Sequence, residues 1–250
     1  MRPLAEAQRD VLVTVPLIEV VNVPLDQAAG LVLASPVTAP HDVPPFTNSA
    51  MDGYAVIAAD VRNPPVELTV TEDVAAGHVA SGTVTTGTAI KIMTGAPVPA
   101  GADSVVKVED TEPGPGRVTI LAAVEEGTAV RPAGGDLAAG AAVFDAGTRL
   151  TARHLAVLAS LGVASPTVRR RPRVALMSTG DEVRPPETAD LSPGQIRDTN
   201  RPLLSRVLAE LGVVVLDLGI IRDDEALLRS TVARAAAEAD AIFTSGGVSM

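Results

Sequence analysis

The chain has 250 residues, enough for one large or two ordinary domains. With 46% apolar and 20% charged residues, its composition is that of a folded, globular protein. Its net charge of −10 argues against a nucleic-acid partner, because phosphate backbones bind to basic surfaces. The absence of Cys and the scattering of three His exclude disulfides and zinc sites. Since no signal-peptide core and no apolar run of roughly 18 residues occurs, we expect a cytoplasmic protein that does not enter a membrane.

The first 40 residues predict two short elements. Residues Glu6 to Val13 have the composition of a short helix, which Pro16 prevents from extending. Residues Asp26 to Leu33 predict a helical turn followed by a strand, with Gly30 as the stop signal between them.

The pattern changes between His41 and about Gly140. Short runs rich in Val, Thr and Ile alternate there with turns that contain Gly or Pro. This rhythm predicts an all-β module of about 100 residues. Because the whole chain has only three Phe, one Tyr and no Trp, the core must consist mainly of aliphatic side chains.

Within this module, the run from Phe46 to Val56 stands out. It contains the single Tyr of the chain, Tyr54, together with Phe46 and a lone acid, Asp52, beside a glycine. One interpretation is a strand entered from a Pro-rich turn, with both aromatic side chains in the core. The other is a functional site, and the spacing alone leaves both open.

A helix and a basic run follow the β module. Thr151 is placed to cap a helix over Ala152 to Leu161, which Gly162 ends. The basic run, residues 169 to 173, holds Arg at four of its five positions. It is either an anion-binding patch or a solvated linker before a new domain.

The last 80 residues alternate strand and helix. Strands are predicted over 174–177, 213–218 and 241–244, and helices over 200–211 and 224–239, the second capped by Asp223 or Asp224. This alternation predicts a doubly wound parallel sheet with right-handed crossovers. Because a three-stranded sheet leaves an edge uncovered, we expect the natural protein to continue beyond residue 250.

Small and hydroxyl residues follow two of these strands. The first strand leads into Ser178-Thr179-Gly180-Asp181-Glu182 and the third into Ser245-Gly246-Gly247-Val248-Ser249. Parallel sheets bind ligands at the carboxyl ends of their strands, where backbone N–H groups can approach an anion. Arg197 lies between the two loops, just before a helix, and supplies donors that suit phosphate. The polar trio Asp198 to Asn200 could simply cap that helix.

Carboxylates recur at turns and element ends. Oxygen ligands of this kind would suit Mg²⁺ bridged to phosphate, although each acid could equally be a turn or cap residue. No Ser-His-Asp, Cys-His or P-loop pattern accompanies them. The acids are Asp52, Asp136, Asp181, Glu182, Asp198 and Asp223.

Five segments, in order, resemble the molybdopterin molybdenumtransferase family, which inserts molybdenum into molybdopterin and includes the catalytic domain of gephyrin. The chain departs from the family pattern twice: Thr47 stands where Asp is usual, and Gly135 where Glu is usual. The five segments are Phe46–Val56, Met93–Pro99, Arg131–Asp136, Ser178–Glu182 with Gly194–Asn200, and Ser245–Ser249.

The resemblance implies an α/β and β multidomain fold. An elongated central domain would comprise residues 11–40 and 141–171, and a β-rich insert domain residues 41–140. A doubly wound parallel α/β molybdopterin-binding domain would occupy residues 172–250 and be incomplete. The C-terminal β domain of the family has no counterpart in the chain.

The resemblance also implies a reaction, in which molybdate and adenylylated molybdopterin give molybdenum cofactor and AMP with the help of Mg²⁺. Family members are homodimers with the active site between subunits. Molybdopterin adenylyltransferase, and the molybdoenzymes or chaperones that receive the cofactor, would be partners. Two alternatives are a molybdopterin adenylyltransferase, which typically lacks the β module, and a non-catalytic molybdopterin-binding scaffold, which would not need the acids.

The matching positions carry the family's roles over to this chain. The implied catalytic residues are Asp52, Asp136, Glu182 and Asp223, of which Asp136, Glu182 and Asp223 would also hold the metal. Those predicted to contact molybdopterin or its phosphate are Thr94, Ser178, Thr179, Gly180, Arg197, Asp198, Ser245, Gly246, Gly247 and Ser249.

Overall fold

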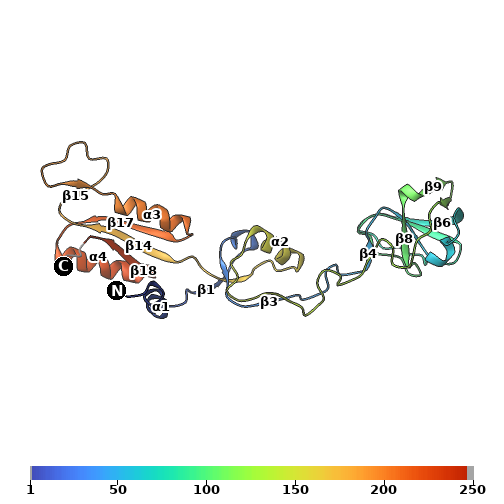
Figure 1. Ribbon diagram of the computed structural model, residues 1–250, viewed down its shortest axis with the longest axis horizontal. Helices are drawn as coiled ribbons and strands as arrows, with labels where there is room; N and C mark the ends of the chain where they lie inside the picture. The colour runs from blue at the N-terminus through green and yellow to red at the C-terminus, as the bar shows by residue number, and fades with distance from the viewer. Residues whose placement is uncertain (1, 247–250) are drawn as a thin grey trace. The chain divides into compact units, whose positions relative to one another are not determined.

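The computed structural model describes residues 2–246 (Figure 1). These residues form two compact units. The first unit consists of the residues up to 35, residues 146–159 and the chain from 163 onward. The second consists of residues 36–145 and 160–162. Within the described range, no helix combines the length and the apolar character needed to cross a membrane.

The second unit is built on a six-stranded sheet, as the alternation of short strands and turns predicted. Only β6 and β7 run parallel, and the other neighbours are antiparallel. Two short antiparallel pairs, β3 with β12 and β4 with β11, complete the unit. The sheet order is β8 (Ser104–Lys107), β5 (Gly53–Val56), β7 (Thr88–Ile92), β6 (Val66–Val74), β10 (Arg117–Ile120) and β9 (Thr111–Gly114). The short pairs are β3 (Val37–Thr38), β12 (Ala142–Phe144), β4 (Asn48–Ser49) and β11 (Val130–Arg131), and the 3₁₀ turns are η2 (Ala58–Val61) and η3 (Val108–Asp110).

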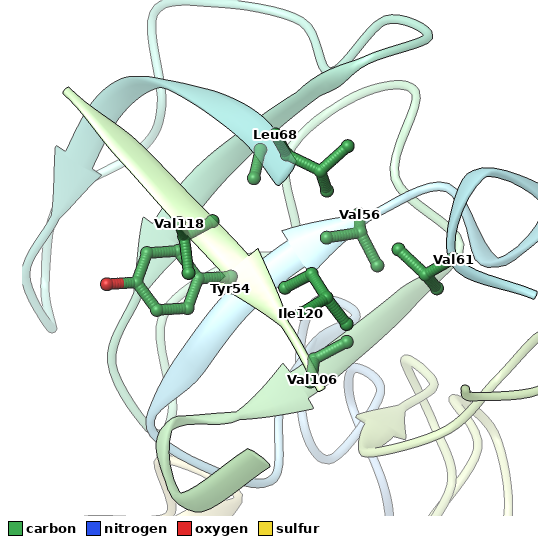
Figure 2. Close-up of a cluster of buried hydrophobic side chains, with 8 residues drawn as sticks. Tyr54, Val56, Val61, Leu68, Val106, Val118 and Ile120 are labelled. Carbon is green, nitrogen blue, oxygen red and sulfur yellow. The ribbon is translucent and has the colours of Figure 1, made fainter. Parts of the chain in front are cut away.

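Both faces of this sheet are buried. Side chains alternate between the faces along a strand. On β5, Tyr54 and Val56 enter one aliphatic cluster, shown in Figure 2, while Ala55 enters another. Tyr54 is therefore a core residue at 6% exposure, whereas Phe46 is 44% exposed and does not belong to the core. The first interpretation of the opening run is thus correct for Tyr54 and wrong for Phe46.

The first unit contains a small three-stranded antiparallel sheet, the helices α1 and α2, and the 3₁₀ turn η1. Residues Val168 of β13 and Leu33 of β2 are buried at its centre. The N-terminal helix α1 is longer than predicted, and none of its residues is buried. The elements are α1 (Leu4–Thr14), β1 (Val20–Asn22), η1 (Leu25–Gln27), β2 (Val32–Leu33), α2 (Ala152–Ser160) and β13 (Thr167–Arg169), with sheet order β1-β13-β2.

The same unit contains the predicted parallel sheet. Its order is β17 (Val214–Ile221), β14 (Arg173–Thr179) and β18 (Ala241–Ser245), and β14 is its buried centre, with Leu176 and Met177 at 0% exposure. The chain steps from β14 to β17 and then back past β14 to β18. With right-handed crossovers, this reversal puts α3 (Asn200–Glu210) and α4 (Glu225–Glu238) on opposite faces of the sheet (Figure 1). A two-stranded ladder, β15 (Val183–Arg184) with β16 (Ile196–Arg197), follows β14.

The basic run is not a free linker, because its side chains are bonded within the unit. Arg170 binds Asp240 through two hydrogen bonds of 2.8 Å and also contacts Glu19. Hydrogen bonds from Arg170 and from the Arg173 N–H lower the pKa of Asp240 to about 2. The run therefore fastens β13 to the parallel sheet, a role that the sequence pattern did not indicate.

Candidate functional site

Three of the family-like segments come together in the second unit. Strand β4, from the opening run, pairs with β11 at the start of the Arg131–Asp136 segment. It also meets the Met93–Pro99 segment, because the Ser49 N–H donates to Ala96 O at 3.0 Å and the Gly95 N–H donates to Ser49 O at 2.8 Å. Segments separated by more than 80 residues thus form one cluster.

Asp52 and Thr94 form the polar centre of this cluster. The Asp52 carboxylate accepts the Thr94 N–H at 2.7 Å and the Thr94 hydroxyl at 2.6 Å. These bonds, the side-chain one foremost, hold the pKa of Asp52 below its ordinary value. An exposed carboxylate kept ionised and fixed in direction is suited to hold a cation or to orient a polar substrate.

The loop from Arg131 to Asp136 is hydrogen-bonded to the residues that precede β4. Its Asp136 N–H donates to Val43 O at 2.9 Å, and its Ala133 N–H donates to the Thr47 hydroxyl at 3.3 Å. Gly134 adopts a positive φ of 69°, and a Cβ there would lie 3.0 Å from the Asp42 carboxylate. Thr47 therefore accepts a hydrogen bond at the position where the family usually has a carboxylate.

Seven of the other predicted site residues lie in the first unit and line a cavity of about 130 Å³ at the carboxyl ends of β14 and β18. Gly180 and Asp223 belong to the same unit but do not line this cavity. Its lining includes the predicted residues Ser178, Thr179, Glu182, Arg197, Asp198, Ser245 and Gly246. We call this the strand-end cavity. The prediction that the two Gly-containing loops share one edge of the sheet is confirmed for the described residues, because β14 and β18 are parallel neighbours.

Thr179 is the residue of the strand-end cavity whose buried polar group is left without a partner in the described structure. Its hydroxyl is buried and makes no hydrogen bond to any described residue. A buried hydroxyl without a partner costs stability unless a ligand or water satisfies it. Gly246 closes over it with a positive φ of 97°, and a Cβ there would come within 2.7 Å of Thr179 O. The loop thus requires glycine at this point, where its backbone packs directly on Thr179.

Asp198 is committed to the protein rather than to a ligand. It is 5% exposed and accepts hydrogen bonds from the Ser178 hydroxyl at 3.0 Å and from Arg201 Nε at 2.8 Å. Its carboxylate also accepts the Arg201 N–H at 3.2 Å, which is the capping role that the sequence left open. Asp198 therefore positions the start of α3 and the Ser178 side chain.

Two residues outside the predicted site complete its framework. The Asn200 amide donates to the Ser245 hydroxyl at 2.9 Å and joins the start of α3 to the end of β18. Arg201 joins Asp198 to Asp217 on β17. Both residues lie in the Arg197–Arg201 stretch, whose density of polar groups before a helix was the available signal.

Arg197 lines the strand-end cavity and also holds the loop that precedes β16. Its guanidinium donates to Thr188 O at 2.7 Å, to Ala189 O at 3.1 Å and to Pro186 O at 3.2 Å. A structural role thus accounts for part of its donor capacity. The remaining N–H groups are available to a ligand.

The acids after β14 and β17 lie close to each other. The Asp223 N–H donates to Asp181 Oδ1 at 3.4 Å. Asp224 caps α4 by accepting the Leu227 N–H at 2.9 Å, so Asp223 is free of the capping role. The Glu182 carboxylate folds over Gly180, where φ is +137° and a Cβ would lie 2.5 Å from it.

The described side chains fit the predicted metal site only in part. Among residues 2–246, no three side chains of His, Asp or Glu are grouped so that they could hold an ion by themselves. Mg²⁺, however, commonly uses one or two carboxylates together with substrate phosphates. Glu182 and Asp223 have the right donor atoms and follow adjacent strands, whereas Asp136 belongs to the other unit. Gly247 and Ser249, predicted to bind phosphate, lie outside the described residues.

Comparison with known proteins identifies relatives of this chain in sequence and in structure. Residues 2–162 match the MoeA N-terminal region (domain I and II), and residues 175–250 match a probable molybdopterin binding domain. A molybdopterin molybdenumtransferase 2 of Mycobacterium tuberculosis is 42% identical over 253 residues, covering 100% of this chain and 62% of its own length. One from Nostoc is 41% identical over 89% of this chain and 52% of its own. The crystal structure of a molybdopterin biosynthesis moeA protein from Pyrococcus horikoshii is 33% identical with a TM-score of 0.89, covering 99% of this chain and 67% of that one.

The chain is thus a multidomain protein with a β-rich unit and an α/β domain that matches a probable molybdopterin binding domain. The chain belongs to the MoeA family, as the match over residues 2–162 shows. The resemblance read from the five segments and the expected multidomain α/β and β fold are both confirmed. The chain spans about 62% of the length of the Mycobacterium tuberculosis relative.

Proposed function

We propose that this chain carries the ligand-binding and acidic parts of an enzyme that inserts molybdate into adenylylated molybdopterin and releases AMP. The observation that supports it most is the strand-end cavity. There, the Thr179 hydroxyl, which has no hydrogen-bond partner among residues 2–246, lies with the Ser245 hydroxyl and the close-packed backbone of Gly246. Such a set suits the terminal phosphate of a pterin.

The acids supply the second part of the proposal. Breaking the phosphoanhydride develops charge on phosphate oxygens, which a bound Mg²⁺ would offset. Glu182 and Asp223 would hold that ion beside the phosphates, with Asp136 contributing as the family resemblance implies. Asp52, which Thr94 keeps ionised and fixed in direction, would orient the reacting groups.

The decisive experiment exchanges Glu182 for Gln in the full-length protein. We expect E182Q to bind molybdopterin in calorimetry but to release AMP about 100-fold or more slowly, because only the charge that holds the ion is lost. Glu238→Gln, on the exposed part of α4, is the matched control and should leave the rate unchanged. Undiminished AMP release by E182Q would refute the catalytic assignment. Binding without any turnover in the unaltered protein would favour the scaffold.

We also propose a cytoplasmic homodimer whose active site is shared between two subunits. The exposed apolar residues of α1 support self-association: Leu4, Val11 and Leu12 are 74%, 61% and 70% exposed. Expressing Asp52→Asn together with E182Q tests the shared site. Mixed dimers should regain one intact site and part of the activity, although each variant alone is inactive. No recovery in verified mixed dimers would mean that both residues act within one subunit.

A further inference from the structure

A second cavity, of about 330 Å³, lies in the first unit and is not used by the proposed reaction. Its lining combines apolar residues such as Leu31 and Leu211 with Arg149 and three arginines of the basic run. We call it the arginine cavity. Pro172 and Gly212 place it at the amino ends of β14 and β17. The strand-end cavity lies at the carboxyl ends, about 20 Å away along a seven-residue strand.

The charges around the arginine cavity are not balanced. Only Arg170 is paired with carboxylates, those of Asp240 and Glu19. Arg169 donates to Ile18 O at 2.6 Å, and Arg171 donates to the carbonyls of Ala29 and Gly212 at 3.2 Å each. Arg149 has no side-chain partner among residues 2–246. Three positive charges thus remain uncompensated in a chain of net charge −10.

Arg169 and Arg171 are also held by backbone carbonyls before any ligand arrives. Arg171 donates to two carbonyls. Gly212 lies so close to Arg171 that a Cβ on Gly212 would be 2.8 Å from Arg171 Nη1. Gly30, with a φ of +79°, approaches the other end of the same guanidinium. Guanidinium groups fixed by neutral carbonyls keep their charge and lose little further entropy on binding.

The geometry points to a binding site for a small organic anion, in which a phosphate or sulfonate group meets Arg149, Arg169 and Arg171 while an apolar body covers Leu31 and Leu211. An inorganic anion would use only the charged part of such a site. A neutral apolar molecule would use only the rest. The combination therefore selects a ligand that has both.

Calorimetry of the full chain with phenyl phosphate tests this site, with inorganic phosphate and benzyl alcohol as the two half-ligands. We expect one saturable phenyl phosphate site and binding at least about 10-fold weaker for each half-ligand. Arg149→Gln should weaken phenyl phosphate binding about 10-fold, since it removes one charge-assisted contact. Leu211→Glu should do the same by adding a negative charge to the lining. Both positions are exposed, so neither change disturbs the core.

Arg153→Gln, on the exposed side of α2, is the matched control and should bind as the unaltered chain does. A variant of the strand-end cavity, Ser245→Val, should also bind normally. Absence of saturable binding would overturn the proposal. So would affinity that falls in Ser245→Val but not in Arg149→Gln, because the ligand would then occupy the strand-end cavity. Equal binding of inorganic phosphate and phenyl phosphate would remove the apolar part of the assignment and overturn it as stated.

Discussion

A single oxygen of Asp52, Oδ1, accepts both the backbone N–H and the hydroxyl of Thr94, at 2.7 and 2.6 Å. No described residue donates to its other oxygen. Thr94 thus fixes the direction of the carboxylate. The two residues come from segments 42 positions apart, so their meeting depends on the pairing of β5 with β7.

The first prediction concerns the pKa of Asp52. Thr94→Val removes the hydroxyl donor, the larger cause of the lowered pKa, so the pKa should rise toward its ordinary value. In the unaltered chain, the lowered pKa stabilises the fold above the ordinary Asp pKa, and this contribution is lost as the pH falls through the folded-state value. Carboxyl NMR titration measures the shift. Thr119→Val, on β10, should leave the Asp52 pKa unchanged, and an unaltered pKa in Thr94→Val would contradict the assignment.

The second prediction concerns Thr47, one of the two departures from the family pattern. Its hydroxyl accepts the Ala133 N–H at 3.3 Å, a long bond. A carboxylate accepts such a bond more strongly, so Thr47→Asp should raise the free energy of unfolding by about 0.5–1 kcal/mol at neutral pH. Thr47→Val, which keeps the shape but loses the acceptor, should lower it. Urea unfolding compares the three proteins. An Asp variant no more stable than the Val variant would show that this bond contributes nothing to the free energy of unfolding.

The third prediction concerns the ion pair beneath the strand-end cavity. The side chain of Asp198 is 2% exposed and bonds to Arg201. Arg201→Ala leaves this buried carboxylate without its cation and should cost about 3 kcal/mol of unfolding free energy. Arg206→Ala, on the same helix, breaks only an exposed pair with Glu210 and should cost less than about 0.5 kcal/mol. Similar losses in both variants would argue that Asp198 has other sufficient partners.

The parallel sheet was predictable because each of its strands is a short apolar run between helical patterns, and all three occur with their expected helices. The pairing within the β module was not. Strand order β8-β5-β7-β6-β10-β9 brings strands from distant parts of the module together, and the register of such short runs depends on tertiary packing. Nothing in the spacing indicated that β6 and β7 are parallel.

The same limit applies to single residues. Periodicity placed a helix after Asp223 and Asp224 but could not decide which of them caps it, because both could; the structure selects Asp224. Arg197 suggested a phosphate ligand, yet much of its guanidinium is used on loop carbonyls. A side chain's partners depend on contacts far along the chain, which a local pattern does not contain.

The fourth prediction concerns the ion pair between Arg170 and Asp240, which joins the segment after β13 to the start of β18. Asp240→Asn keeps the shape and an acceptor oxygen but loses the charge, and should lower the unfolding free energy by about 1 kcal/mol at neutral pH. Because the folded-state pKa of Asp240 is about 2, below the ordinary 3.8, its contribution is complete above pH 4 and is lost as the pH falls toward 2. The difference in melting temperature between the two proteins should therefore shrink between pH 4 and pH 2. Asp190→Asn, in the exposed loop before β16, should show no such difference at any pH. A difference between the Asp240 variant and the unaltered chain that stays constant down to pH 2 would mean that the charge of Asp240 does not stabilise this junction.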